Sequence, residues 1–340
     1  MIVLQRIGRS PNRWGGWMAG FFLTLAAILV LATPSLAQAP PEKADNVATK
    51  KKKQKPVSTP ALGPSAASTA AAGPAPSQAS DTAQGTQAQN PLTPLWGVIN
   101  ENYTNFRMGP LEKTQNILVV EPVIPLKLTP DWNLVTRWNT PITYMPRLAN
   151  PMGPIPGIDP DFGLSNMQPQ FFFTPAHAGS FTWAVGPALW LPTASDKTLG
   201  INEWGGGPVV VALTTQGPLL AGFLAQNIWA GSQSSLPGQH VNELLIEPFV
   251  FYNMPGGWFL TYRPLITADW TVDSHHRWTV PVGGGFGRVF PVGDMVMDVH
   301  VQAFYNGLTA PAAGMTNVGK WTSLLVVHFL FPGARVPSLF

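Results

Sequence analysis

Residues 321–331 read WTSLLVVHFLF, and a strand over this stretch would have two different faces. One face would be apolar with aromatic rings at both ends, comprising Trp321, Ser323, Leu325, Val327, Phe329 and Phe331. The other face would admit Lys320 and His328. An apolar face bounded by aromatic residues is typical of a strand that crosses a bilayer, with the mixed face turned toward a lumen.

The same alternation, with a period of two residues, recurs along the chain. In MVMDVHVQAFYN, residues 295–306, Val301 and its apolar neighbours alternate with Gln302 and other polar residues. In GWFLTYRPLITADW, residues 257–270, Arg263 falls opposite a face of Trp, Leu and Tyr residues. This period indicates strands and not helices.

The connections between these strands alternate in length. Short ones, such as TPDWN and NMPGG, alternate with long ones at 144–162, 193–200, 230–240, 270–276 and 307–318. Outer-membrane barrels have short periplasmic turns and longer outer loops. About eleven strands are evident, and an even number requires one more, for which VINENYTNFRM at residues 98–108 is the only candidate. We therefore predict an all-β fold, a single antiparallel up-and-down transmembrane β-barrel of about twelve strands.

The composition agrees with a turn-rich membrane protein. Of the 340 residues, 45% are hydrophobic and only 11% are charged, against roughly 25% in ordinary soluble domains. The 33 glycines and 36 prolines favour turns over a helical bundle. Several prolines nevertheless fall inside predicted strands, where they remove a ladder hydrogen bond, and we predict β-bulges there: Pro122, Pro169, Pro187, Pro208, Pro248 and Pro264. With no cysteine, the chain has no disulfide or thiolate site.

The first 90 residues differ from the rest. Three arginines precede the apolar run WMAGFFLTLAAILVLA, and SLA ending at Ala37 offers a cleavage site, so residues 1–37 are predicted to be a signal peptide. A retained membrane anchor is the alternative. Residues 38–90, rich in Ala, Pro, Ser and Lys, have no apolar periodicity and are predicted to be a disordered linker in the periplasm. Residues 91–340 would form the barrel.

Charge is segregated in the same way. Basic residues exceed acidic ones in residues 1–90, whereas residues 91–340 have an acidic excess. The predicted barrel is therefore no nucleic-acid binder. The lysine-rich run at 50–55 is expected to be a solvated part of the linker, with contact to anionic lipid or cell wall as the alternative.

Several stretches carry a family resemblance. They are NPLTPLWGVINENYTNFRMGP, NILVVEPVIPLKLTPDWNLVTRWNTPI, GPALWLPT and SHHRWTVPVGGGFGRVF. Over residues 90–332 the chain resembles the proteobacterial outer-membrane barrels grouped as "MetA-pathway of phenol degradation" proteins, often labelled transporters or, misleadingly, neuromedin U. The resemblance implies a transport-like barrel without a settled substrate and supplies no catalytic residues. One departure is the tail GARVPSLF after Phe331, where such barrels usually end on an aromatic residue.

Alternation assigns a set of polar residues to the lumen. The candidates are Glu121, Arg137, Asn139, Gln170, Arg263, Asp269, Asp298, His300, Gln302 and His328. They could form a constriction that selects solutes. Alternatively, Arg263, Arg137, Glu121 and Asp298 could form an ion-pair network that fills the lumen. A barrel of about twelve strands leaves both open, since about eight strands give a packed interior and sixteen or more a channel.

Other chemistries have weak support. Asp273, His275 and His276 in DSHHRW lack an evident third metal ligand. The glycine triplets precede strands and not the helix that a phosphate loop needs. No G-x-S-x-G occurs, and His300 and His328 have no sequence-level serine partner. We therefore predict no catalytic, cofactor-binding or metal-binding residues, and no enzyme.

These features together predict a channel or transporter-like barrel in the bacterial outer membrane. It would pass small solutes passively, hydrophobic or aromatic ones among them on the strength of the family name. A lumen-plugged structural or adhesion barrel at the cell surface is the alternative, and a lipid-modifying outer-membrane enzyme a weaker one. The expected partners are outer-membrane lipid, the barrel-assembly machinery and a small-molecule solute. The substrate and the oligomeric state do not follow from the sequence.

Overall fold

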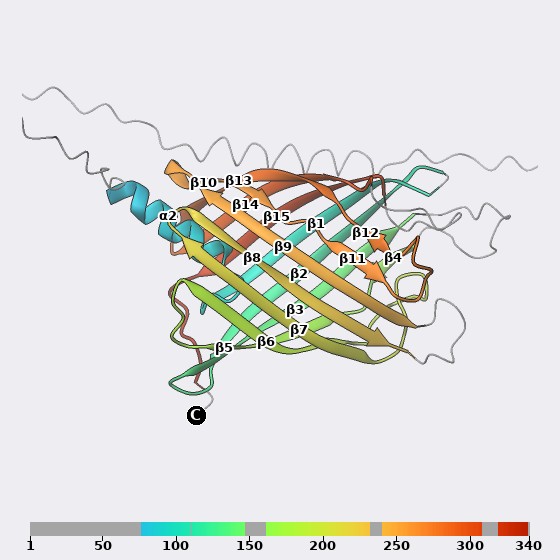
Figure 1. Cartoon of the computed structure of the whole chain (residues 1–340), viewed down its shortest axis with the longest axis horizontal. Coiled ribbons are helices and arrows are strands. Elements are labelled where there is room, and N and C mark those ends of the chain that lie inside the picture. Colours follow the sequence, from blue (N-terminus) through green and yellow to red (C-terminus); the bar gives the residue numbers. More distant parts are fainter. Residues whose placement is uncertain (1–75, 110, 147–160, 232–239, 308–318, 339–340) are drawn as a thin grey trace, which may run out of the picture. The chain divides into compact units, whose positions relative to one another are not determined.

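The protein is described by a computed structural model (Figure 1). The described residues are 76–109, 111–146, 161–231, 240–307 and 319–338. They belong to one compact unit, Ala70–Phe340. The predicted signal peptide, residues 38–75 of the predicted linker and parts of the long loops lie outside the described residues.

The described chain is a helix followed by antiparallel strands. The helix is α2 (Pro76–Gln89), and a short 3₁₀ turn, η1 (Pro255–Gly257), lies between two strands. The strands are β1 (Trp96–Met108), β2 (Lys113–Lys127), β3 (Trp132–Met145), β4 (Asp161–Leu164), β5 (Gln168–Pro175), β6 (Phe181–Trp190), β7 (Gly205–Gln216), β8 (Leu219–Ala230), β9 (Val241–Asn253), β10 (Trp258–Tyr262), β11 (Ile266–Asp269), β12 (Trp278–Thr279), β13 (Val282–Val292), β14 (Met295–Tyr305) and β15 (Trp321–Phe331). All belong to a single sheet.

These segments make a closed barrel of twelve antiparallel strands, as predicted. Three barrel strands each consist of two segments. The segments β4 and β5 both pair with β3 and form one such strand, and β10 and β11 both pair with β9 and form the second. The third consists of β12 and β13, which pair with β11 and β10. Neighbours in the sheet are neighbours in sequence, apart from the closing pair of β1 and β15. That seam runs from Trp96 opposite Phe331 to Phe106 opposite Trp321. The predicted first strand is therefore confirmed.

The outer wall is apolar, whereas alternate side chains are buried inside. In β15, Leu324, Val326, His328 and Leu330 are buried, in the alternation predicted from the sequence. Large apolar side chains are exposed around the wall, among them Val185, Val210, Phe223, Val250, Leu260, Phe286 and Val301. A continuous exposed apolar wall of this kind suits hydrocarbon and not water.

Aromatic side chains gather toward both ends of the wall. Toward the short turns, the rings of Trp132 and Trp183 meet edge to face at 6.0 Å. Toward the long loops, Tyr305 and Trp321 lie 4.9 Å apart. Such girdles mark the two membrane interfaces of transmembrane barrels.

The last part of the predicted linker is a helix and not disordered chain. Residues 76–89 were expected to be disordered, but they form α2, which contacts η1 and lies at the short-turn end of the barrel (Figure 1). Ala88 and Gln89 are buried. The prediction of disorder was wrong because it required an apolar helix face, whereas this helix buries one alanine in the core cluster and one glutamine against polar groups. No helix within the described ranges is long and apolar enough to cross a bilayer.

Most of the strand prolines do not lie at bulges. Among the described ladders, the register shifts between Asn105 and Met108, and it shifts by one residue between β4 and β5 beside Pro169, where Ile142 lies opposite Leu164 and Asn139 opposite Gln168. Around Pro122, pairing with β3 stops at Val120 and resumes at Val123 in the same register. The ladder at Pro122 therefore has a short gap, and no residue changes face there.

The tail after Phe331 folds across the short-turn end. The backbone N–H of Lys127 donates to the carbonyl of Pro337 at 2.9 Å, and Trp96 Nε1 donates to the carbonyl of Arg335 at 3.0 Å. The tail thus bridges from β15 past β1 to β2, over the seam that closes the barrel. β15 itself ends at Phe331.

Candidate functional site

The register of the strands places the predicted polar residues on the lumen side. Residues directly opposite in neighbouring strands share a face. Arg137 lies opposite Gln170, and Asp298 lies opposite His328, so each of these pairs shares a face. Seven of the ten candidates are buried, namely Glu121, Arg137, Gln170, Asp298, His300, Gln302 and His328. The other three, Asn139, Arg263 and Asp269, are half-buried.

Ion pairs span the lumen. Arg263 Nε donates to Glu247 Oε1 at 2.6 Å, and its guanidinium reaches Glu101 Oε1 on β1 at 3.0 Å. Because β13, β14 and β15 lie between β10 and β1 in the sheet, the contact with Glu101 crosses the interior. Tyr103 Oη donates to the other oxygen of Glu101 at 2.6 Å. The two carboxylates thereby hold Arg263 inside the barrel.

A second pair joins Arg137 and Glu121, which face each other from β3 and β2. The network considered from the sequence is thus formed only in part. Arg137 pairs with Glu121 as considered, but Arg263 pairs with Glu101 and Glu247. Asp298 instead lies against His300, with Oδ1 2.9 Å from His300 Nδ1.

Aromatic rings surround the Asp298–His300 pair. Phe259 and Phe251 meet the His300 ring edge to face, at 5.6 and 6.3 Å. His300 Nε2 is buried without a hydrogen-bond partner in the described structure. This part of the lumen therefore combines an apolar surface with an unused polar atom.

The N-terminal helix enters the lumen from the short-turn end. Gln89 and Asn253 exchange amide hydrogen bonds, each at 2.9 Å, and the backbone N–H of Gly256 donates to Asp81 Oδ2 at 3.1 Å. Leu92 and Thr93, beyond the helix, are also buried. Hydrogen bonds to Asn253 and Gly256 therefore hold this segment, together with the apolar packing of Ala88 and Leu92 in the core cluster.

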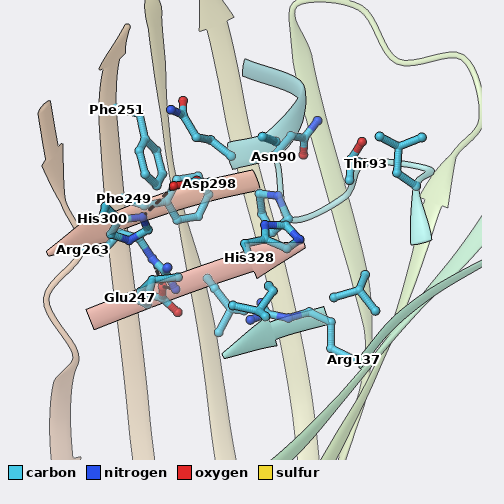
Figure 2. A pocket seen from close by; sticks show the side chains of 18 residues that line it. Asn90, Thr93, Arg137, Glu247, Phe249, Phe251, Arg263, Asp298, His300 and His328 are labelled. Carbon is cyan, nitrogen blue, oxygen red and sulfur yellow. Dashed lines mark hydrogen bonds and ion pairs between the residues drawn. The ribbon is translucent and has the colours of Figure 1, made fainter. Parts of the chain in front are cut away.

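A small cavity lies between the tip of α2 and the ion pairs (Figure 2). Gln89 and Asn90 line it from the helix side, and Arg137, Arg263 and His328 from the wall. Its volume is about 50 Å³, room for only a few water molecules. In this conformation the lumen is narrow at the level of the ion pairs.

The lumen has an acidic balance at this level. Among the described residues at this level, the four carboxylates of Glu101, Glu121, Glu247 and Asp298 stand beside two guanidinium groups, those of Arg137 and Arg263. Farther along, Asp269 lies opposite Glu243, which adds carboxylates toward the long-loop end. A confined surface with an excess of carboxylates attracts cations and repels anions.

Sequence reasoning missed three residues of this site. Glu101, Glu247 and Gln226 line the lumen but were not among the candidates. Gln226 accepts from Gln170 Nε2 at 2.7 Å. Glu247 interrupts the apolar run ELLIEPFVF, and an isolated charge in such a run was the available signal.

The histidines of the loop at 273–276 and of the lumen were also considered as metal ligands or as partners of a nucleophile. His276 Nδ1 lies 2.6 Å from Asp273 Oδ2, and this contact lowers the pKa of Asp273 below its ordinary value. No group of three potential metal ligands occurs in the described part of the chain. Nor, in those same ranges, is a serine or threonine hydroxyl hydrogen-bonded to His300, the contact that an acyl-transfer nucleophile requires.

No protein-family model matches the sequence, and no curated protein matches it. An outer-membrane channel from Pseudomonas putida F1 is similar in structure over 70% of this chain and 94% of that chain, with 11% sequence identity and a TM-score of 0.48. Outer-membrane phospholipase A from Escherichia coli is similar over 72% and 98%, with 13% identity and a TM-score of 0.38. The CymD monoaromatic hydrocarbon channel is similar over 73% and 91%, with 10% identity and a TM-score of 0.37. Membership of the family that the sequence resembles stays a prediction.

Proposed function

We propose that this protein is a channel in the bacterial outer membrane that passes small solutes passively, and that residues 76–95 close its periplasmic end. The short turns and α2 would lie in the periplasm and the long loops outside. The observation that supports the proposal most directly is how the N-terminal segment closes the lumen. The lumen is blocked by a separate segment held through hydrogen bonds to Asn253 and Gly256, a contact that can be exchanged for water when the segment moves.

The lumen chemistry supports a preference among solutes. The excess of carboxylates favours cations and neutral molecules over anions. The rings of Phe249, Phe251 and Phe259 beside the cavity offer an apolar surface. We infer that small neutral solutes with an aromatic or hydrophobic part are accommodated, in agreement with the family resemblance.

A second candidate is a barrel that stays plugged and serves a structural or adhesion role. The small cavity and the buried ion pairs favour it, since both fill the interior. The two candidates differ in one respect: whether the lumen conducts once α2 is displaced.

A substitution in α2 distinguishes them. A Cβ added at Gly85 would lie 2.4 Å from Asn253 Oδ1, so the Asn253 amide must shift in Gly85→Leu, and we expect the larger side chain to break the Gln89–Asn253 pair and displace the helix. Ala83→Leu is the matched control, because Ala83 is exposed on the same helix. Both proteins are inserted into planar bilayers, and single-channel conductance is recorded beside that of the unaltered chain.

We expect Gly85→Leu to raise the open probability or the conductance, while Ala83→Leu leaves both unchanged. A folded Gly85→Leu barrel that carries no ionic current would refute the channel and favour the plugged barrel. Equal currents from both variants would show that the position of α2 does not control passage.

A further inference from the structure

The membrane-facing wall carries a group of polar side chains at the seam of the barrel. We call it the amide patch, and it consists of Asn100, Asn102 and Thr104 on β1, Asn116 on β2 and Ser323 on β15. In the register, Thr104 lies opposite both Ser323 and Asn116, so the three side chains form a row across the strands. Asn100, Asn102, Asn116 and Ser323 are half-buried.

Two observations place the amide patch outside the lumen. Glu101 and Tyr103 are joined by a hydrogen bond within the barrel, so the residues that alternate with them on β1 point the other way. Asn102 lies opposite Leu325. Leu325 belongs to the apolar face of β15, opposite the buried residues Leu324 and Val326.

The amide patch lies at hydrocarbon depth. Its strand runs from Trp96 near the short turns to Phe106 near the long-loop end. At about 3.4 Å per residue and a tilt of about 40°, this length spans roughly 25 Å of membrane thickness, the height of the apolar band of such barrels. Asn102 falls near the middle of that span.

The hydrogen bonds within the amide patch occupy the Asn116 amide but leave the side-chain oxygen of Asn100 without a donor. Asn102 Nδ2 donates to Asn116 Oδ1 at 3.1 Å, and Asn116 Nδ2 donates back to Asn102 Oδ1 at 2.9 Å. Asn116 Nδ2 also lies 3.0 Å from Thr104 Oγ1 and 3.3 Å from the carbonyl oxygen of Tyr103. Asn100 Nδ2 donates to the carbonyl of Val327 at 3.2 Å, and no donor to Asn100 Oδ1 is found among the described residues. Each amide offers two N–H donors and two acceptor sites, and an unused one in hydrocarbon is costly because no water replaces it.

Outward polar residues elsewhere on the wall have different surroundings. Asn227 and Asn242 also form an amide contact, but Trp270 Nε1 donates to Asn227 at 3.0 Å at the aromatic girdle near the long loops. The hydroxyls of Thr136 and Thr140 donate to backbone carbonyls. The amide patch is therefore set apart by its depth and by the unused acceptor of Asn100.

We propose that the amide patch is the surface through which two copies of this chain associate within the membrane. A primary amide both donates and accepts, so a two-fold axis through the patch can pair asparagines of one copy with those of the other. No charged residue belongs to the patch, so the two-fold brings no like charges together. The small side chains of Ala303 and Ser323, opposite each other in the register, allow two walls to approach closely.

The absence of cysteine from the sequence makes a direct test simple. Ser323→Cys places a single thiol within the amide patch, and Val210→Cys places one on the outward face of β7, five strands away from β1 in the sheet order. Each variant is reconstituted into phospholipid vesicles at low protein density and treated with a short bis-maleimide. We expect covalent dimers from Ser323→Cys at several times the yield from Val210→Cys. Equal yields would overturn the proposal.

A second pair of variants tests the amides themselves. In the Ser323→Cys protein, Asn102→Leu combined with Asn116→Leu removes the reciprocal pair, and Asn227→Leu combined with Asn242→Leu is the matched control. We expect the first combination to lower the dimer yield at least five-fold and the control to leave it unchanged, with folding verified by heat-modifiable migration in gels. A folded first combination that still forms the full yield of dimer would refute the role of the amides. Failure of that combination to fold would also contradict the proposal, because it would show that the amides serve the folding of the single chain and not the contact between two copies.

Discussion

Adjacent residues of β14 offer a sharp test of which side of the wall meets lipid. Val301 is 42% exposed on the outer wall, and Gln302 is 3% exposed on the lumen side. Val301 lies opposite Leu325, which in turn lies opposite Asn102 near the middle of the membrane span. Arginine at either position adds the same side chain at almost the same depth, so the comparison isolates the two environments.

The expected costs differ because the surroundings differ. An arginine on the lipid face near the midplane costs about 2–4 kcal/mol in barrels. Gln302→Arg removes the acceptor of the Arg263 backbone N–H, worth about 0.5–1.5 kcal/mol, and its new charge enters a lumen with an excess of carboxylates. We therefore expect Val301→Arg to be the more destabilising variant by about 1–3 kcal/mol.

The measurement is equilibrium unfolding in urea of both variants and the unaltered protein in lipid vesicles. A difference of about 1.4 kcal/mol corresponds to a tenfold change in the folding equilibrium constant, which is readily resolved. Equal free energies of unfolding for the two variants, or a more stable Val301→Arg, would show that the assignment of inner and outer faces is wrong.

Three further outcomes follow from the lumen. Arg137→Met leaves the Glu121 carboxylate buried without its partner and should lower the free energy of unfolding in urea by about 3–5 kcal/mol. Adding Glu121→Leu should recover most of that free energy. A decrease below about 1 kcal/mol in Arg137→Met would mean that the pair is not formed. In a conducting form such as Gly85→Leu, Glu247→Gln should lower the cation-over-anion permeability ratio read from reversal potentials, and an unchanged ratio would exclude this level as the selective one. Proteinase K acting on the mature protein in detergent should leave a fragment that begins between residues 76 and 80, and a fragment beginning near residue 91 would show that α2 is not seated in the barrel.

The barrel wall could be predicted from the sequence because each strand meets two different solvents. Hydrocarbon demands apolar side chains on one face, and the lumen tolerates Asp298, His300 and Gln302 on the other, so a period of two is visible in one strand without knowledge of its neighbours. The first strand was identified by parity alone, and the structure confirms it as β1.

Partners across the lumen could not be predicted in the same way. Arg263 and Glu101 are 162 residues apart and meet only because the barrel closes at its seam. The alternation of polar and apolar residues predicts that both side chains point inward, but it does not predict the position of either strand around the barrel. The pairing depends on strand order, on register and on the direction in which the arginine side chain extends. No local sequence pattern predicts that direction.

The helix α2 shows why a compositional rule for disorder fails inside a polar lumen. A segment of Ala, Gln, Thr and Ser cannot bury enough apolar surface to fold alone in water, and that argument assumes that its partner is an apolar core. Here the partner surface is partly polar: Gln89 meets Asn253, and Asp81 meets the backbone of Gly256, while Ala88 packs in the core cluster. A helix satisfies its own backbone, so its side chains need only match the hydrogen bonds that the wall offers. An amide-rich segment directly before the first strand of a barrel therefore favours a helix inside the lumen as much as a linker outside it.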